Sequence, residues 1–136
     1  MILNFTLGSQ KAKKVSEYIG LTLWLFIIPI KLNRYFNLEI LEALSNNLPS
    51  FLGAAGLFLI LLSNKSRFSK LTVVKSAIIA IVISVLIELI QLLPRPGILS
   101  YAVYTFDYFD ILFSIIGVVI FYSIIVLLYS KKIINN

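Results

Sequence analysis

The chain has 136 residues, 60% of them hydrophobic, and a mean hydropathy of +0.98, whereas a soluble domain is roughly 45–50% apolar; this excludes an ordinary water-soluble protein and favours one membrane domain over residues 1–136. It has no cysteine and no histidine, which excludes disulfides, thiolate metal sites and a Cys nucleophile, and removes the commonest general base and metal ligand. The net charge of +6 is better explained by membrane topology than by nucleic-acid binding, so no nucleic-acid partner is expected.

Four apolar segments follow one another along the chain. They predict membrane spans at about 15–32, 47–63, 71–93 and 108–129. A spanning helix needs roughly 20 residues, which the third and fourth segments reach outright, while the first two need flanking residues or local thinning of the bilayer. Pro29 and Pro49 predict the end of the first helix and the start of the second. The predicted fold class is all-α, a polytopic bundle of four transmembrane helices.

The loop between the first two segments, residues 33–47, has an amphipathic pattern. Leu38 and Leu41 are three residues apart, and so are Glu39 and Glu42, so each pair shares a side of a helix. Two interpretations stay open. The loop forms a short amphipathic helix on the outer membrane surface, or it is the helical start of the second span.

The distribution of lysine and arginine predicts the orientation of the spans. Eight of the twelve basic residues precede the first segment, separate the second from the third, or follow the fourth, and a ninth, Lys75, lies just inside the start of the third. The other three are Lys31, Arg34 and Arg95. Cytoplasmic loops of membrane proteins carry the excess of positive charge. The sequence therefore predicts a multi-pass protein of the cell membrane with both termini in the cytoplasm.

Polar residues gather where the third segment ends, in the stretch "IELIQLLPRPG". Glu88 and Gln91 are three residues apart and share a side of the helix. Arg95 follows in the predicted outer loop and is placed to fold back over this pair. The predicted topology puts all three residues near the outer face.

A second polar group opens the fourth segment, in the stretch "FDYFDILFSIIG". Asp107, Asp110, Ser114 and Gly117 are spaced by 3, 4 and 3 residues, which draws one stripe along a helix face. Ser114 and Gly117 are small enough to let another helix approach closely. Asp107 is also explained as an N-cap. With Glu88, Gln91 and Arg95, these residues are predicted to converge in one outward-facing pocket.

Charged residues inside spans are costly and are functional candidates by default. A purely structural alternative stays open, in which Arg95 ties the third and fourth spans together through Glu88 or Asp110. No cofactor and no dedicated metal site are predicted. Glu88, Asp107 and Asp110 nevertheless leave open a hard divalent cation, because carboxylate oxygens are its usual ligands.

The order and placement of these polar residues resemble the signature of the VanZ-like membrane protein family. That signature is Glu-x-x-Gln at the end of one span, an arginine, and D-x-x-x-N-x-x-G opening the last span. Glu88, Gln91, Arg95, Asp110 and Gly117 match it. Asp107 matches a frequent additional acid, and Ser114 replaces the usual asparagine. The arginine-to-aspartate spacing is longer than usual, and the family's Asp-Lys pair and histidine near the second span are missing.

The resemblance implies a cell-envelope role, because the family is named for resistance to the glycopeptide teicoplanin in Gram-positive bacteria. The Ile-, Asn- and Lys-rich composition is compatible with a Gram-positive source. Three functions follow as alternatives. The first is a non-catalytic protein that binds a lipid-linked peptidoglycan precursor or the glycopeptide itself at the outer face. The second is an enzyme on such a ligand, with Glu88 or Asp110 as acid or base and Arg95 as anion contact. The third is a small transporter or transporter subunit, which would need to form an oligomer. The lack of a histidine or cysteine makes the enzyme the less favoured of the first two.

Overall fold

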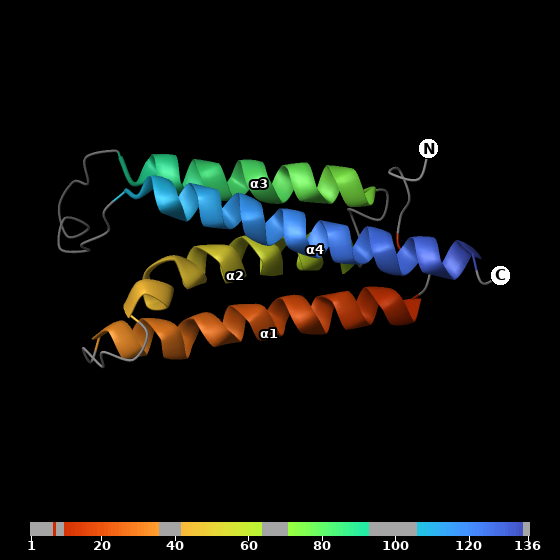
Figure 1. Ribbon diagram of the computed structural model, residues 1–136, viewed down its shortest axis with the longest axis horizontal. Helices are drawn as coiled ribbons and strands as arrows, with labels where there is room; N and C mark the ends of the chain where they lie inside the picture. Colours follow the sequence, from red (N-terminus) through yellow and green to blue (C-terminus); the bar gives the residue numbers. More distant parts are fainter. Residues whose placement is uncertain (1–6, 8–9, 36–41, 64–70, 93–105, 135–136) are drawn as a thin grey trace.

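The computed structural model describes residue 7 and residues 10–35, 42–63, 71–92 and 106–134. Four helices make up this part of the chain, and it contains no strand (Figure 1). They are α1 (Gln10–Tyr35), α2 (Glu42–Ser63), α3 (Val73–Ile90) and α4 (Tyr108–Ile134). The predicted all-α fold class is therefore confirmed.

Each of these helices is long and apolar enough to cross a membrane. The qualifying segments are Gln10–Leu32, Asn46–Ser63, Val73–Ile90 and Tyr108–Leu128. Large apolar side chains such as Leu25 on α1, Ile87 on α3 and Leu128 on α4 point away from the bundle and are exposed. Lipid accepts such surfaces, whereas water disfavours apolar patches of this extent. The chain thus has the architecture of a multi-pass membrane protein.

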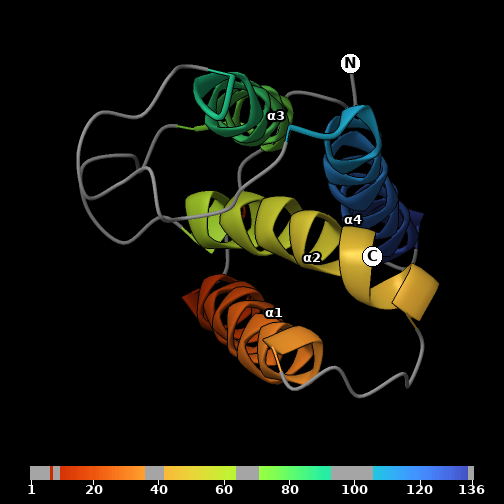
Figure 2. The same cartoon turned by 90° about the vertical axis from the view of Figure 1, so that its left-hand side faces the viewer.

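Pro29 and Pro49 both lie inside helices, which corrects the prediction that they mark helix ends. Pro29 is followed by further helical residues up to Tyr35, and α2 begins before Pro49, at Glu42. The first turns of α2 are bent away from the rest of the helix (Figures 1 and 2). A bend is expected there, since proline removes one backbone hydrogen bond and crowds the preceding turn. Membrane helices tolerate this because neighbouring groups can satisfy the freed carbonyl.

The loop predicted over residues 33–47 is largely taken up by the two neighbouring helices. Its first residues belong to α1, which ends at Tyr35, and residues from Glu42 onward belong to α2. The second interpretation, a helical start to the second span, therefore holds for residues 42–47. The stretch 36–41, where a separate amphipathic helix was the alternative, lies outside the described residues.

Helix α2 is the centre of the bundle. It packs against each of the other three helices, and α3 also packs against α4. Within the described residues, α1 contacts neither α3 nor α4. Figure 2 shows the same arrangement, with α1 on one side of α2 and with α3 and α4 on the other. The helices alternate in direction, so α1 and α3 end where α2 and α4 begin; we call this end the distal end (Figure 1).

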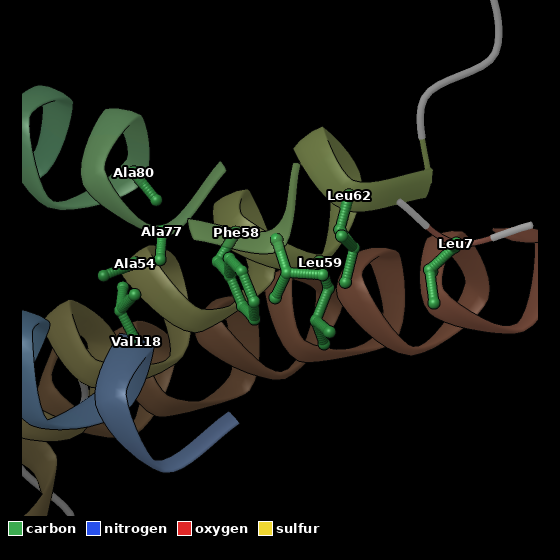
Figure 3. Packing of buried hydrophobic residues seen from close by; sticks show 9 residues of the cluster. Leu7, Ala54, Phe58, Leu59, Leu62, Ala77, Ala80 and Val118 are labelled. Atoms are coloured by element: carbon green, nitrogen blue, oxygen red, sulfur yellow. The ribbon is translucent and has the colours of Figure 1, made fainter. Parts of the chain in front are cut away.

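The hydrophobic core lies around α2. This helix contributes Ala54, Phe58, Leu59 and Leu62, each at most 3% exposed (Figure 3). The other buried apolar residues of this cluster are Leu7, Val73, Ala77, Ala80 and Val118. Alanine on α3 and valine on α4 allow close approach to the larger side chains of α2. The core therefore holds α3 and α4 to the same central helix and fixes their relative depth in the membrane.

Helices α1 and α2 approach each other closely through glycine. A Cβ added at Gly20 would lie 2.9 Å from the carbonyl oxygen of Gly56, and a Cβ at Gly56 would lie 2.9 Å from that of Gly20. One turn to either side, α1 donates a side-chain hydrogen bond to an α2 carbonyl. The Ser16 hydroxyl donates to Leu59 at 2.9 Å, and the Trp24 indole donates to Gly53 at 3.0 Å. The small residues 53–56 are thus a helix-packing patch.

Candidate functional site

Two of the predicted polar residues lie at the distal end of α3. Glu88 is in the last turn of the helix and is only 7% exposed. Gln91 is the C-cap residue, and its backbone N–H donates to the Glu88 carbonyl at 3.1 Å. Its side-chain Nε2 also donates to Oε2 of Glu88 at 3.0 Å. The helix end therefore places an amide donor directly on a buried carboxylate, as their spacing predicted.

Asp107 caps α4. Its Oδ1 accepts a hydrogen bond from the backbone N–H of Phe109 at 2.9 Å, and its carbonyl accepts one from the N–H of Asp110 at 3.1 Å. A side-chain oxygen bonded two residues into the helix is the usual N-cap arrangement, because the first backbone donors of a helix have no partner within it. The capping role predicted for Asp107 is confirmed.

Asp110 is held by a residue of α2. The Ser50 hydroxyl donates to Oδ1 of Asp110 at 2.8 Å. The Ser114 hydroxyl, one turn further along α4, donates to the backbone carbonyl of Ser50 at 3.3 Å. Ser114 is 3% exposed, so this contact lies inside the helix interface. Asp110 and Ser114 are thereby fixed to the start of the central helix.

Gly117 continues the same contact between α4 and α2. A Cβ added there would lie 2.6 Å from the carbonyl oxygen of Phe51, closer than Cβ atoms approach other atoms in folded proteins. The predicted close helix approach is therefore present, and its partner is the backbone of α2. Ser114 and Gly117 both contact α2. Their predicted place in an outward-facing pocket stays a prediction.

The carboxylates of α3 and α4 form one electrostatic group at the distal end. Glu88 interacts with Asp110 and Asp107, which repel its negative charge, and with Lys31, which attracts it. Lys31 belongs to α1, is exposed and lies near the distal end of that helix. Glu88 thus interacts electrostatically with two acids on α4 and one ammonium group on α1. We call the residues Glu88, Gln91, Asp107, Asp110, Ser50 and Lys31 the distal cluster.

Two further predictions about the site concern Arg95 and a bound metal ion. Arg95 lies outside the described residues, so its predicted place in the cluster stays a prediction. In the described ranges, no group of three or more histidine, cysteine, aspartate or glutamate side chains is arranged to hold a metal ion. Glu88, Asp107 and Asp110 therefore do not make the cation site that their sequence positions left open.

Sequence reasoning missed Ser50 and Lys31. Both were assigned only to their own segment, Ser50 as an apolar-helix residue and Lys31 as a loop cation. The signal that could have found them is depth in the membrane. Ser50 opens the second span and Lys31 closes the first, so antiparallel helices bring both to the level of Glu88 and Asp110. The choice of neighbouring helix, however, requires the packing around α2.

No protein-family model, curated protein or solved structure matches this chain. The resemblance to VanZ-like proteins accordingly remains a prediction that depends on the residues of the α3–α4 region.

Proposed function

We propose that this protein is a VanZ-like component of the cell envelope that binds a polar or lipid-linked ligand at its distal cluster and so contributes to glycopeptide resistance. The distal end faces outward in this proposal, and both termini are cytoplasmic. The observation that carries it is Glu88, a carboxylate 7% exposed in a membrane-spanning helix and repelled by two further acids. A lone charge costs roughly 2.5–3.5 kcal/mol at mid-membrane on insertion scales and less near the interface, so a buried carboxylate in the last turn of a span still needs a physical reason.

Helix packing alone gives no such reason. The α3 face that carries Glu88 otherwise consists of Val73, Ser76, Ala77, Ala80 and Ser84. These small residues pack without any charge, as membrane helices commonly do. Three carboxylates in mutual repulsion also make a poor structural tie. The negative field of these carboxylates favours a ligand group that is cationic or rich in hydrogen-bond donors.

Glu88→Gln tests the proposal, because it keeps the shape and removes the charge. In a teicoplanin-susceptible host that expresses the protein, the variant should reach the wild-type amount of folded protein and lose the protection. Glu17→Gln is the matched control, since Glu17 lies in the first half of α1 and the distal end is where α1 ends. If Glu88→Gln protects as fully as the wild type does, the distal cluster has no part in resistance.

The proposed orientation has its own test. The chain lacks cysteine, so single-cysteine variants report without background. Ser100→Cys should react with a membrane-impermeant thiol reagent in intact cells, and Arg67→Cys should react only after the cells are opened. The reverse pattern would put the distal end in the cytoplasm and remove the outer-face role.

A further inference from the structure

We infer that Ser50 is a positioning residue of the distal cluster, which holds the Asp110 carboxylate in place while Ser114 holds Ser50. The link to ligand binding depends on the proposed function, but the positioning itself does not. The D-x-x-x-S-x-x-G stripe of α4 then has two parts with different roles. Asp110 belongs to the distal cluster, and the serine and glycine fix α4 on α2.

The contacts between α2 and α4 occur in sequence along both helices. Ser50 Oγ donates to Asp110 Oδ1 at 2.8 Å, and Ser114 Oγ donates to the Ser50 carbonyl at 3.3 Å. At Gly117 the two backbones come so close that a Cβ would lie 2.6 Å from the Phe51 carbonyl oxygen. Because three successive contacts join the same two helices, neither can slide or rotate without moving the Asp110 carboxylate.

The acceptor of the Ser50 hydroxyl distinguishes this residue from most serines and threonines in membrane helices. Their hydroxyls commonly donate to a carbonyl of their own helix. Thr22, Ser63 and Ser123 do so here, three or four residues back along the chain. Ser50 instead donates to a carboxylate on a different helix, 60 residues away in sequence. A hydrogen bond from a hydroxyl to a charged acceptor is stronger than one between neutral groups. It therefore restricts the orientation of the acceptor carboxylate.

Ser50→Ala, Ser50→Thr and Ser123→Ala test this role by chemical labelling of Asp110. Purified protein is treated with dicyclohexylcarbodiimide, which adds to a carboxyl oxygen, and each modified acid is quantified by mass spectrometry. Removal of the hydroxyl that occupies Oδ1 should raise labelling of Asp110 about tenfold, in line with the loss of one hydrogen bond to a charged group. Ser50→Thr keeps a hydroxyl and should restore the wild-type labelling.

Two references make the result specific. Asp107 is bonded to the Phe109 backbone and not to Ser50, so its labelling in the same sample should not change. Ser123→Ala removes a serine hydroxyl from α4 that bonds only within its helix, and it should leave Asp110 labelling at the wild-type level. If Ser50→Ala leaves Asp110 labelling unchanged, or if Ser50→Thr behaves like Ser50→Ala, the hydroxyl does not position Asp110 and the inference is wrong.

The same variants separate this inference from the proposed function. Asp110→Asn should abolish protection against teicoplanin if Asp110 contacts the ligand. Full protection by Asp110→Asn would remove Asp110 from the proposed function, while the labelling results would still decide the positioning role. With the function intact, Ser50→Ala should weaken protection and Ser50→Thr should restore it.

Discussion

Polar groups serve different purposes in two regions of this bundle. One region is the contact between α1 and α2, and the other is the distal cluster. Along α1, the side chains of Ser16 and Trp24 donate to backbone carbonyls of α2, on either side of the Gly20–Gly56 approach. Every group in that contact is neutral. At the distal end, by contrast, three carboxylates are gathered and two of them accept bonds from a serine and a glutamine side chain.

The difference shows which polar groups the fold requires. Neutral donors paired with carbonyls, next to small residues, are the standard means of joining membrane helices. The α1–α2 contact therefore needs no functional explanation. Repelling carboxylates weaken a helix contact, so their presence at the distal end is better explained by function. We expect variants in the first region to lower stability and variants in the second to lower activity.

The largest loss of stability is expected from Gly56→Ala. Its new Cβ would meet both the Gly20 carbonyl and the Trp24 ring, so α1 must move away from α2. Overpacking of this kind costs about 1–3 kcal/mol. Thermal unfolding of the purified protein in detergent should show it as a clearly lowered midpoint.

Gly53→Ala is the matched control on the same helix. Its Cβ would lie 3.8 Å from Ile27 Cδ1, an ordinary van der Waals distance, so the midpoint should stay near the wild-type value. Equal stability of the two variants would mean that α1 and α2 are not as close as described.

Gly117→Ala extends the test to the border between the two regions. The added Cβ would press on the Phe51 carbonyl and push α4 from α2, at a cost of about 1–2 kcal/mol. Because Ser50 and Asp110 sit in the same contact, this variant should lose both stability and protection against teicoplanin. A loss of stability with full protection would show that the cluster tolerates movement of α4.

Much of this fold follows from local rules that sequence alone can apply. Apolar length predicted the four helices, spacing predicted the Glu88–Gln91 pair, and the position of Asp107 at the start of the fourth segment predicted its capping role. These features depend on one helix or on one turn. Local rules failed at Pro29 and Pro49, because in a membrane bundle neighbouring helices can stabilise a helix that continues through proline.

Features that depend on which helices are neighbours could not be predicted in the same way. The stripe from Asp110 to Gly117 predicts a close helix approach without naming the partner helix, and α2, the central helix, makes the contact with Ser114 and Gly117. Ser50 and Lys31 became part of the cluster for the same reason. A stripe of residues on one helix shows which face of that helix is packed, but not which neighbouring helix packs there. With four helices, several arrangements satisfy the same stripe.

A smaller effect is expected from Ser16→Ala in the α1–α2 contact. It removes the hydrogen bond to Leu59 and leaves a small side chain that fits the same space. Hydrogen bonds between membrane helices contribute on average about 0.6 kcal/mol, so the midpoint should fall slightly. Thr22→Val is the control, because the Thr22 hydroxyl bonds only within α1 and is exposed. If Ser16→Ala lowers the unfolding midpoint as much as Gly56→Ala does, hydrogen bonding contributes as much as close packing to this contact.

The smallest effect is expected from Asp107→Asn, which separates the two roles that Asp107 can have. As an N-cap, asparagine is about as good as aspartate, so the variant should keep its stability to within ~0.3 kcal/mol, whereas Asp107→Ala should lose about 1 kcal/mol. Removal of the charge also weakens the repulsion that Glu88 experiences. If the cap is the whole role, Asp107→Asn should protect fully against teicoplanin. Lost protection with unchanged stability would instead make the charge of Asp107 part of the ligand site, because no change in folding could then explain the loss.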